Sequence, residues 1–360
     1  MRRRDFCYNT AVDRAKELKP VGARIQKLRA QRLTRLRARA GAAMRAANWE
    51  KSARICVQAA KLVTGSQLAA LHLQIGVCRQ LQSRFDDALA SFTESGRVAD
   101  QCGDKRTKAN SLGNIGLVWQ RKGDHTKALA YYEQCVGILG ELGDRLGQAT
   151  ATTNIGLLRQ EEGDLAGALD CFNLALDVFV ANGDKVGQAS ALTNIGRVYL
   201  DRDEPERALD HLGKALPLTR EAKERHCEVT VLANLANVHM KTGRLEEAQA
   251  GYEALLKAHQ EMGDPDGEAR DRVGIGDVLV RRGDYTAAAG YLTQALKAFL
   301  KLGIADGPRK CLTGLRMCLT VVGVKDFSAA CEKAKLEPRT MTELIKVLEL
   351  RQPLPTGRRA

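Results

Sequence analysis

The sequence predicts an all-α protein, a solenoid of antiparallel helix pairs, and three observations support this fold class. A pattern of forty residues that begins at Ala109 is repeated from Ala149, with Asn-Ile-Gly and Gly-Asp at matching places. A fixed period of roughly 20 to 50 residues is typical of stacked repeats. Ala and Leu dominate the 44% of hydrophobic residues, and aromatic residues make up only 4%, as closely packed helices require. Gly and Asp recur together between the predicted helices, as expected for short turns.

The repeated unit is predicted to be a helix of about four turns, a tight turn, a second helix and another turn. A small residue marks the first helix of each unit and an alanine marks the second, because a larger side chain at the helix crossing would push the axes apart. The markers are Gly76, Gly116, Gly156, Gly196, Ala236 and Gly276 in the first helices, and Ala88, Ala128, Ala168, Ala208, Ala248 and Ala288 in the second. A large residue four positions after each alanine is expected to fill the space toward the next unit.

Most turns contain a glycine followed by an aspartate. We expect the glycine to end one helix in the left-handed conformation and the aspartate to accept a hydrogen bond from the first turn of the next helix. These pairs are Gly103-Asp104, Gly123-Asp124, Gly143-Asp144, Gly163-Asp164, Gly183-Asp184, Gly263-Asp264 and Gly283-Asp284.

The chain is expected to have four parts. Residues 1–23 are a basic N-terminal arm, 24–304 a solenoid of about seven repeats, 305–351 a degenerate repeat with a capping helix, and 352–360 a basic tail. Such atypical ends are usual in stacked repeats. An apolar helical stripe leads into the first repeat. It consists of Ile25, Leu28, Leu33, Leu36, Ala40 and Ala43.

Positive charge is concentrated at the N-terminus. The net charge is +13, and residues 1–45 hold fourteen Lys or Arg against three acidic residues, so the repeats are close to neutral. The arginines expected to form a basic surface are Arg2, Arg3, Arg4, Arg29, Arg32, Arg35, Arg37 and Arg39. Such a surface suits an acidic partner, tubulin being one example. Only Phe6 and Tyr8 could stack on bases in this stretch, which argues against nucleic acid.

Cysteine usage and hydropathy indicate a reducing compartment and no membrane span. Ten cysteines are scattered without a Cys-x-x-Cys pair, so we expect small buried hydrophobic residues rather than disulfides or zinc ligands. No stretch approaches the roughly 18 apolar residues of a transmembrane helix. We expect a cytoplasmic protein, with the cytoskeleton or cilium as a further possibility. The Arg-rich, acid-poor beginning also leaves a mitochondrial transit peptide open.

These residues resemble the tetratricopeptide repeat. Leu112, Gly116, Trp119, Ala128 and Tyr132 match its pattern, as do Leu192, Gly196, Tyr199, Ala208 and Ala215, and the resemblance covers about residues 24–330. The forty-residue period is similar to that of Pins-type adaptors, rapsyn-like scaffolds and ciliary repeat proteins. The resemblance implies a right-handed superhelical solenoid that acts as an interaction scaffold.

In the resembled family the first helices line a groove, and the residue two before the marker glycine points into it. The resemblance therefore implies a peptide-binding groove of Asn114, Asn154, Asn194, Asn234, Arg121, Arg197, Asn237, Lys241, Arg270 and Arg281. A ladder of Asn can donate to and accept from a peptide backbone, although Asn can equally bond within its own helix. Lys241, Arg270 and Arg281 could form a basic end for an acidic peptide, or simply a solvated face with alternating charge. Four residues before the ladder Asn, Pins-type adaptors tend to have Arg, whereas this chain has Asn110, Thr150, Ser190 and Thr230.

No catalytic or metal-ligand spacing occurs in the sequence. The adjacent pair His226-Cys227 would diverge on a helix, and the Gly-x-Gly stretches lie inside predicted helices rather than after a strand. We therefore expect no enzymatic activity, no metal and no cofactor. The leading hypothesis is a protein-interaction scaffold. The alternative is a structural part of a large ciliary or cytoskeletal assembly, docked through the basic arm.

Overall fold

The computed structural model describes residues 26–304 and 306–349. The chain divides into two compact units, here called the N-terminal unit, which ends at Val178, and the C-terminal unit, which begins at Phe179. The described residues form helices and turns, with no strand among them. The predicted fold class, an all-α solenoid of helix pairs, is confirmed. The predicted arm at 1–23, with Arg2, Arg3 and Arg4, and the tail at 352–360 lie outside the described residues.

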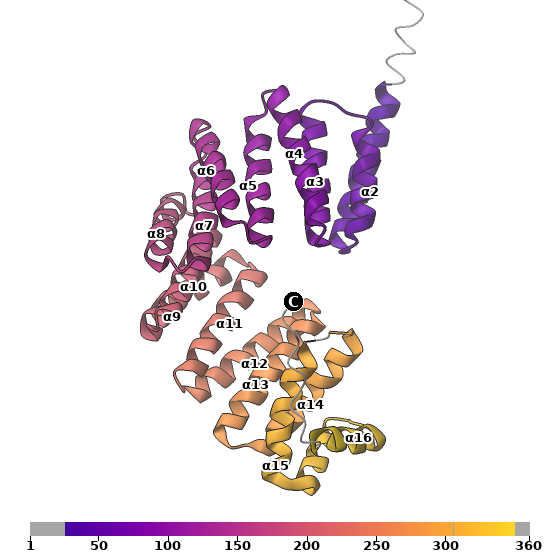
Figure 1. Cartoon of the computed structure of the whole chain (residues 1–360), viewed down its shortest axis with the longest axis vertical. Helices are drawn as coiled ribbons and strands as arrows, with labels where there is room; N and C mark the ends of the chain where they lie inside the picture. The colour runs from indigo at the N-terminus through magenta and orange to yellow at the C-terminus, as the bar shows by residue number, and fades with distance from the viewer. Residues whose placement is uncertain (1–25, 305, 350–360) are drawn as a thin grey trace, which may run out of the picture. The chain divides into compact units, whose positions relative to one another are not determined.

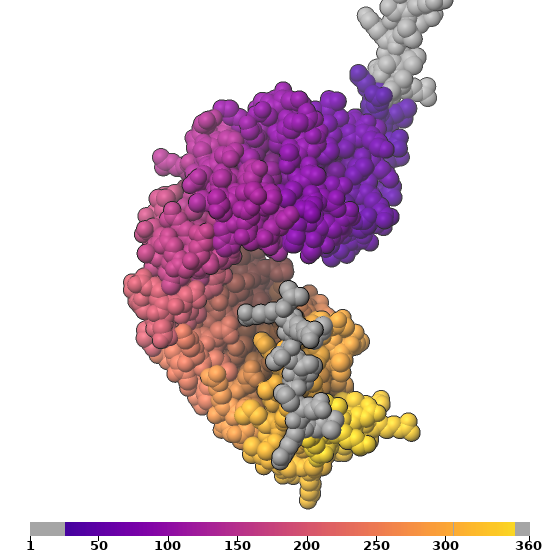
Figure 2. Space-filling model, in the orientation of Figure 1, coloured from indigo at the N-terminus to yellow at the C-terminus, as the bar shows by residue number. Residues whose placement is uncertain are grey.

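In the N-terminal unit each helix from α2 to α6 packs against the next one in the chain, as Figure 1 shows for α3 to α7. The space-filling view shows these helices as one continuous surface (Figure 2). A helix at 26–45 comes first. It is followed by α2 (Trp49–Ala60), α3 (Ser66–Leu81), α4 (Phe85–Gln101), α5 (Lys105–Arg121), α6 (His125–Glu141), α7 (Arg145–Glu161) and α8 (Leu165–Ala181), within which the unit boundary falls.

The C-terminal unit is likewise built of helices that pack against their neighbours in the chain. Its helices are α9 (Lys185–Asp201), α10 (Pro205–Ala222), α11 (Arg225–Lys241), α12 (Leu245–Met262), α13 (Pro265–Arg282), α14 (Tyr285–Leu302), α15 (Gly307–Lys333) and α16 (Pro338–Glu349). The long helix α15 is interrupted at Gly323, which has a positive φ of 76°. Two helices therefore share this segment, and α16 packs against it as the last helix described.

The turns follow a period of twenty residues. From residue 83 to residue 323, every twentieth residue has a positive φ between 58° and 85°. Most are glycines, but Ser83, Asp203 and Lys223 adopt the same conformation. The aspartates that follow cap the next helix, as Asp124 does by accepting a hydrogen bond from the Lys127 N–H at 3.1 Å. The predicted Gly-Asp turn is confirmed, and the left-handed conformation extends to turns that have no glycine.

The marker glycines lie where the two helices of a pair approach most closely. A Cβ atom on Gly116 would lie 2.8 Å from the ring of Tyr132 and 3.2 Å from the carbonyl oxygen of Ala128. Gly76 meets Phe92, and Gly156 meets Phe172, in the same way. The large residue expected to reach toward the next unit therefore also covers the glycine of its own pair. Tyr132 does both, because it packs against Leu158 of α7 as well.

The stripe that precedes the first repeat is only partly buried. Leu36, Ala40 and Ala43 are buried, and Leu33 packs against the same core. Leu28, in contrast, is 57% exposed, because the helices facing 26–45 do not cover its first turn. Ile25 lies outside the described residues.

Of the described cysteines, all are unpaired and most are buried, as expected for small core residues. Cys102 departs from this expectation because it lies exposed at the end of α4. Burial raises the pKa of the Cys56 thiol to about 11. None of the described helices is both long enough and apolar enough to cross a membrane.

Candidate functional site

The N-terminal unit contains a cavity of about 670 Å³ between the first helices of three successive pairs. We call it the N-terminal cavity. Leu73 and Val77 come from α3, and Leu117 comes from α5. The remaining lining residues are Arg106, Asn110, Gly113, Asn114, Cys135, Leu139, Asp144, Leu146, Gly147, Thr150, Ala151 and Asn154. A few amide groups therefore stand among apolar side chains, a combination typical of binding pockets.

Two of the predicted ladder residues, Asn114 and Asn154, line this cavity and differ in their hydrogen bonds. The Asn114 amide donates to the carbonyl oxygen of Asn110 at 2.8 Å, within its own helix. The Asn154 amide makes no hydrogen bond to any of the described residues. Asn114 therefore adopts the local arrangement that was the alternative to a ladder, whereas both polar atoms of Asn154 are available to a ligand.

An ion pair closes one edge of the N-terminal cavity. Arg106 of α5 approaches Asp144, at the start of α7, to 2.8 Å. Asp144 also accepts a hydrogen bond from the Gly147 N–H at 3.0 Å, so its carboxylate is fixed by the helix cap. With one cation and one carboxylate, the lining of this cavity is electrically neutral.

The C-terminal unit contains a second cavity, of about 490 Å³, which we call the C-terminal cavity. Its lining comes from α11, α12 and α13, with one residue from α15. The residues are Ala233, Asn237, Tyr252, Leu255, His259, Asp264, Asp266, Gly267, Arg270, Asp271, Val273, Gly274, Asp277 and Lys310. Four carboxylates therefore face two permanent cations and one histidine.

The two cavities occupy the same place in the repeat. Adding 120 to the residue number, which is three repeats, converts ten lining positions of the N-terminal cavity into lining positions of the C-terminal cavity. Leu139 becomes His259, and Ala151 becomes Asp271. At the ladder position Asn154 becomes Gly274, where an added Cβ would meet the Tyr252 ring at 2.5 Å. The fold thus offers one pocket twice, with a neutral lining and with an ionic lining.

Most charged groups of the C-terminal cavity have partners within it. His259 Nδ1 lies 2.6 Å from the Asp271 carboxylate, which is buried, and burial raises the pKa of Asp271 while His259 opposes that shift. Arg270 makes two hydrogen bonds of 3.1 Å to Asp266. Asp264 accepts from the Gly267 N–H at 3.1 Å.

Asp277 is the exception in this cavity. It forms no ion pair or hydrogen bond with any of the described residues. Desolvation by the surrounding protein raises the pKa of its carboxyl, and Lys310 and Arg281 partly oppose the rise. The side chain nevertheless remains in contact with solvent, so it is accessible from the cavity.

The predicted groove residues are distributed over both units. Asn114 and Asn154 line the N-terminal cavity, and Asn237 and Arg270 line the C-terminal cavity. Asn237 accepts a hydrogen bond from the Tyr252 hydroxyl at 2.8 Å. The residues that line neither cavity are Asn194, Asn234, Arg121, Arg197, Lys241 and Arg281. Asn234 donates to the carbonyl oxygen of Thr230 at 3.0 Å and so repeats the local bond of Asn114.

The three cations of the predicted basic end all have partners inside the protein. Lys241 pairs with Asp203 at 2.8 Å, and Arg281 donates to the Met240 carbonyl oxygen at 2.8 Å. Arg270 is held by Asp266. An acidic peptide would have to compete with these contacts, so the basic end remains a prediction that the geometry does not favour.

The basic helix at 26–45 is different. Arg29, Arg32, Arg35, Arg37 and Arg39 are exposed, and none forms an ion pair with another described residue. The stretch 26–48 contains no acidic side chain at all. This helix therefore presents uncompensated positive charge beside the first repeat.

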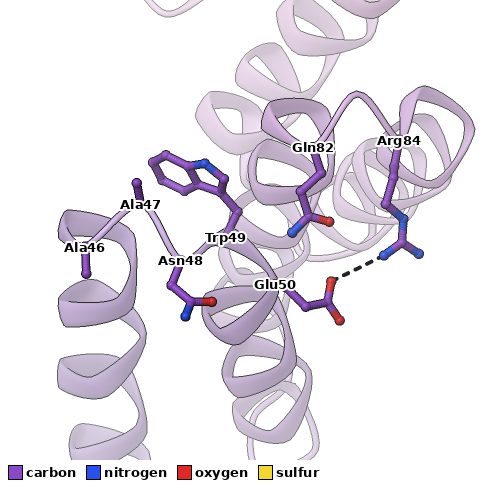
Figure 3. Close-up of a pocket in the computed structure, with 7 residues that line it drawn as sticks. All are labelled: Ala46, Ala47, Asn48, Trp49, Glu50, Gln82 and Arg84. Atoms are coloured by element: carbon purple, nitrogen blue, oxygen red, sulfur yellow. Dashed lines mark hydrogen bonds and ion pairs between the residues drawn. The ribbon is translucent and has the colours of Figure 1, made fainter. Parts of the chain in front are cut away.

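A third cavity lies at the turns of the first repeat (Figure 3). Its volume is about 620 Å³, and Ala46, Ala47, Asn48, Trp49, Glu50, Gln82 and Arg84 line it. Glu50 and Arg84 form an ion pair of 3.4 Å across it. Asn48 accepts a hydrogen bond from the Lys51 N–H at 3.0 Å and so caps α2. The polar groups here serve the turn and the pairing of neighbouring helices.

Sequence patterns alone did not identify His259, Asp271 or Asp277 as one cluster. They lie on two helices, and their proximity depends on the packing of α12 against α13. The forty-residue period offers a signal, because these positions correspond to Leu139, Ala151 and Leu157. Among the residues that the structure describes, no group of three His, Cys, Asp or Glu side chains could hold a metal ion.

Residues 66–141, 147–221 and 228–301 match a family model described as "Tetratricopeptide repeat". No curated protein matches the chain.

Solved structures show the same fold at low sequence identity. The chain is similar to the apo form of RapI, with 15% identity, a TM-score of 0.60, and coverage of 89% of this chain and 85% of that one. A signal transduction ATPase with a tetratricopeptide repeat sensor, from Pyrococcus horikoshii, shares 14% identity at a TM-score of 0.62, over 83% of this chain and 47% of that one. A Rap protein complexed with Competence and Sporulation Factor shares 13% identity at a TM-score of 0.52, over 90% and 99%.

Proposed function

The chain belongs to the tetratricopeptide repeat family, and from that premise we propose that it is a non-enzymatic scaffold or adaptor. It binds segments of partner proteins in the groove lined by its first helices. The observation that carries the proposal is the N-terminal cavity, where the amide of Asn154 stands among apolar side chains and has no hydrogen-bond partner among the described residues. An extended segment can satisfy that amide with its backbone while its apolar side chains are buried against Leu73 and Leu117.

Structural neighbours support this function at the level of the fold. One Rap protein was solved with Competence and Sporulation Factor, and another, a conjugation gene regulator, with the Phr* peptide. Both likenesses are at 15% identity or less, so they carry no information on which segment this chain binds. The proposed partner is therefore described only by its chemistry, an extended segment with apolar side chains.

Replacement of Asn154 by alanine tests the proposal. We expect a peptide selected on the full chain from a displayed library to bind Asn154→Ala more weakly by about 1–3 kcal/mol, because a polar group of the bound backbone loses its partner. Fluorescence anisotropy measures the affinity. The matched control is Asn173→Ala, since Asn173 is exposed on α8 and lines neither cavity. Equal affinities for both variants and the original chain would remove Asn154 from the site.

The basic helix at 26–45 favours a second candidate function. In this alternative the chain is a structural part of a ciliary or cytoskeletal assembly, and it docks on an acidic surface such as tubulin. The exposed arginines, which form no ion pair with another described residue, support it. The finer likeness to Pins-type adaptors, rapsyn-like scaffolds and ciliary repeat proteins belongs to the scaffold proposal.

Salt dependence distinguishes this second function. We expect association with microtubules to weaken steeply between about 50 and 200 mM salt, because exposed charges are screened. Changing Arg29, Arg32, Arg35, Arg37 and Arg39 to Gln should abolish it without loss of the helical signal in circular dichroism. Cosedimentation that survives these five changes would place the contact elsewhere.

A further inference from the structure

The C-terminal cavity has a chemistry that the N-terminal cavity lacks. We propose that it receives a lysine or arginine side chain of the bound segment, and that Met317 and Val321 of α15 contact an apolar side chain of the same segment. This inference rests on the proposed function, since it names the partner chemistry of a groove assumed to bind protein segments.

Charge complementarity is the first argument. Four carboxylates line the cavity, against Arg270 and Lys310. Arg270 is already held by two hydrogen bonds to Asp266, and His259 is held by Asp271 at 2.6 Å. Asp277 has no partner among the described residues, so one carboxylate is left to face the groove. A guanidinium or ammonium group is the side-chain partner that such a carboxylate binds most strongly.

A cationic partner should bind Asp277 more strongly than it would bind a carboxylate on an open surface, because of the local environment. Protein atoms around Asp277 raise the pKa of its carboxyl, which means that solvation of the charge is incomplete. Lys310 and Arg281 act on it without forming an ion pair, and Arg281 is engaged with the Met240 carbonyl oxygen. A cation from a partner would restore the missing solvation directly.

Two exposed apolar residues follow the cavity residue Lys310 on α15. Lys310 lines the cavity, and Met317 and Val321 follow it on α15 at spacings of seven and eleven residues. These spacings place the three side chains on one face of a helix. Met317 is 48% exposed and Val321 is 58% exposed. The segment that fits this surface therefore carries a basic residue close to an apolar one.

The repeat supplies an internal comparison. The corresponding N-terminal cavity is neutral, with Leu139 and Ala151 in place of His259 and Asp271. A general need of the fold therefore does not explain the acidic lining, because the same pocket is built without it. The two cavities should select different side chains.

A peptide selection on the full chain tests the inference. The probe is a displayed library of random twelve-residue peptides, selected on the original chain and counter-selected on Asp277→Lys. We expect the surviving peptides to be enriched in Lys or Arg next to an apolar residue. Changing that basic residue to Gln should weaken binding about tenfold in fluorescence anisotropy, the loss typical of a charge-assisted hydrogen bond.

Charge exchange then establishes direct contact. A peptide with Glu in place of the basic residue should bind Asp277→Lys within about threefold of the original pair, and Glu253→Gln, which removes a carboxylate outside the cavity, should leave binding unchanged. Asp277 and Glu253 are both exposed, so neither change should lower the melting temperature. Met317→Ala should weaken the same peptide about threefold, by the loss of partial apolar burial.

The possible failures are distinguishable. If neither chain enriches any peptide, the proposed groove function fails together with the inference. If peptides bind equally well to the original chain and to Asp277→Lys, with no basic preference, the groove function stands and only the inference is overturned. Residues 350–360 contain three arginines, and a chain that ends at Glu349 tests them as an internal occupant. If this shortened chain bound the peptide tenfold more tightly than the original chain, the occupant of the cavity would be residues 350–360 rather than a partner.

Discussion

At the scale of single residues, the close approach of two helices depends on glycine, whose side chain is a single hydrogen atom. Gly116 faces the fully buried ring of Tyr132, whose hydroxyl donates to the Gln120 side chain at 2.8 Å. A ring held at both ends cannot move aside for an added methyl group. The same contact occurs at the same spacing of sixteen residues between Gly76 and Phe92, and between Gly156 and Phe172.

We therefore predict that Gly116→Ala lowers the free energy of unfolding by about 1–3 kcal/mol, the cost of overpacking a close-packed interior. Gly137→Ala is the matched control, because Gly137 lies inside α6 with nothing within 4 Å of its added Cβ. That change should stabilise by up to about 1 kcal/mol through helix propensity. Urea denaturation measures both, and a stabilised Gly116→Ala would contradict the close approach.

Individual side-chain contacts could not be predicted from the sequence. The period located the marker glycines and the capping aspartates correctly. It did not show that the Asn114 amide bonds the carbonyl of Asn110, or that the Arg281 guanidinium donates to Met240, forty-one residues earlier. Such contacts depend on side-chain rotamers and on the distance between neighbouring pairs, which a repeat pattern does not specify.

At the scale of elements, the turns determine where each helix ends. Lys223 ends α10 with a φ of 58°, and Glu224 precedes α11 without a capping hydrogen bond from its side chain. In the turns with Gly-Asp, glycine adopts this conformation without a steric cost, and aspartate caps the helix. The turn at 223–224 is thus a weaker version of the common one.

We predict that Lys223→Gly with Glu224→Asp raises the free energy of unfolding by about 1–2 kcal/mol, from relieved left-handed strain and one new helix cap. The reverse change, Gly123→Lys with Asp124→Glu, should destabilise by a similar amount. Thermal denaturation of both variants makes the comparison. A loss of stability in the first variant would show that Lys223 or Glu224 has another role.

Ion pairs between the two helices of one repeat recur with regular spacing. Lys105 pairs with Glu141 at 2.7 Å, and Arg225 pairs with Glu261 at 2.9 Å, each thirty-six residues apart. Their side chains are about half exposed, so each contributes little to stability. They help to align the two helices of a repeat but add little to its stability. The sequence contained this signal, but only the packed structure shows which of the many charges meet.

At the scale of the whole molecule, partly buried histidines make the fold sensitive to acid. Burial lowers the pKa of His72, His211 and His239. Within the described residues, the Nδ1 atoms of His211 and His239 are buried without a hydrogen-bond partner. As pH falls through the unfolded pKa of about 6.5, the unfolded chain takes up protons that the folded chain does not, so stability is lost.

We predict that the urea midpoint is lower at pH 5.5 than at pH 7.5, and that changing His211 and His239 to Gln reduces the difference. Carboxylates with lowered pKa, such as Asp104 and Glu141, lose their stabilising effect only when the pH approaches the ordinary carboxyl pKa of about 4. Asp271 acts in the opposite direction, because its pKa is raised. A midpoint that is unchanged or higher at pH 5.5 would contradict the prediction.

The fold could be predicted almost entirely from the sequence, whereas the site could be predicted only in part. The forty-residue period specifies helices, turns and pair contacts, because each depends on residues close in the chain or one repeat away. The chemistry of each cavity depends on four helices at once, and the exchange of Leu139 and Ala151 for His259 and Asp271 becomes meaningful only when their helices are packed.

The central claim, that the groove rather than the basic helix selects partners, is tested most directly by quantitative affinity purification with three chains. These are the original chain, a chain with Asn114 and Asn154 changed to Ala, and a chain with Arg29, Arg32, Arg35, Arg37 and Arg39 changed to Gln. Our account predicts that the main partners are lost from the Asn variant and retained by the Arg variant, while both remain helical. Retention by the Asn variant and loss from the Arg variant would contradict it and favour docking through the basic helix.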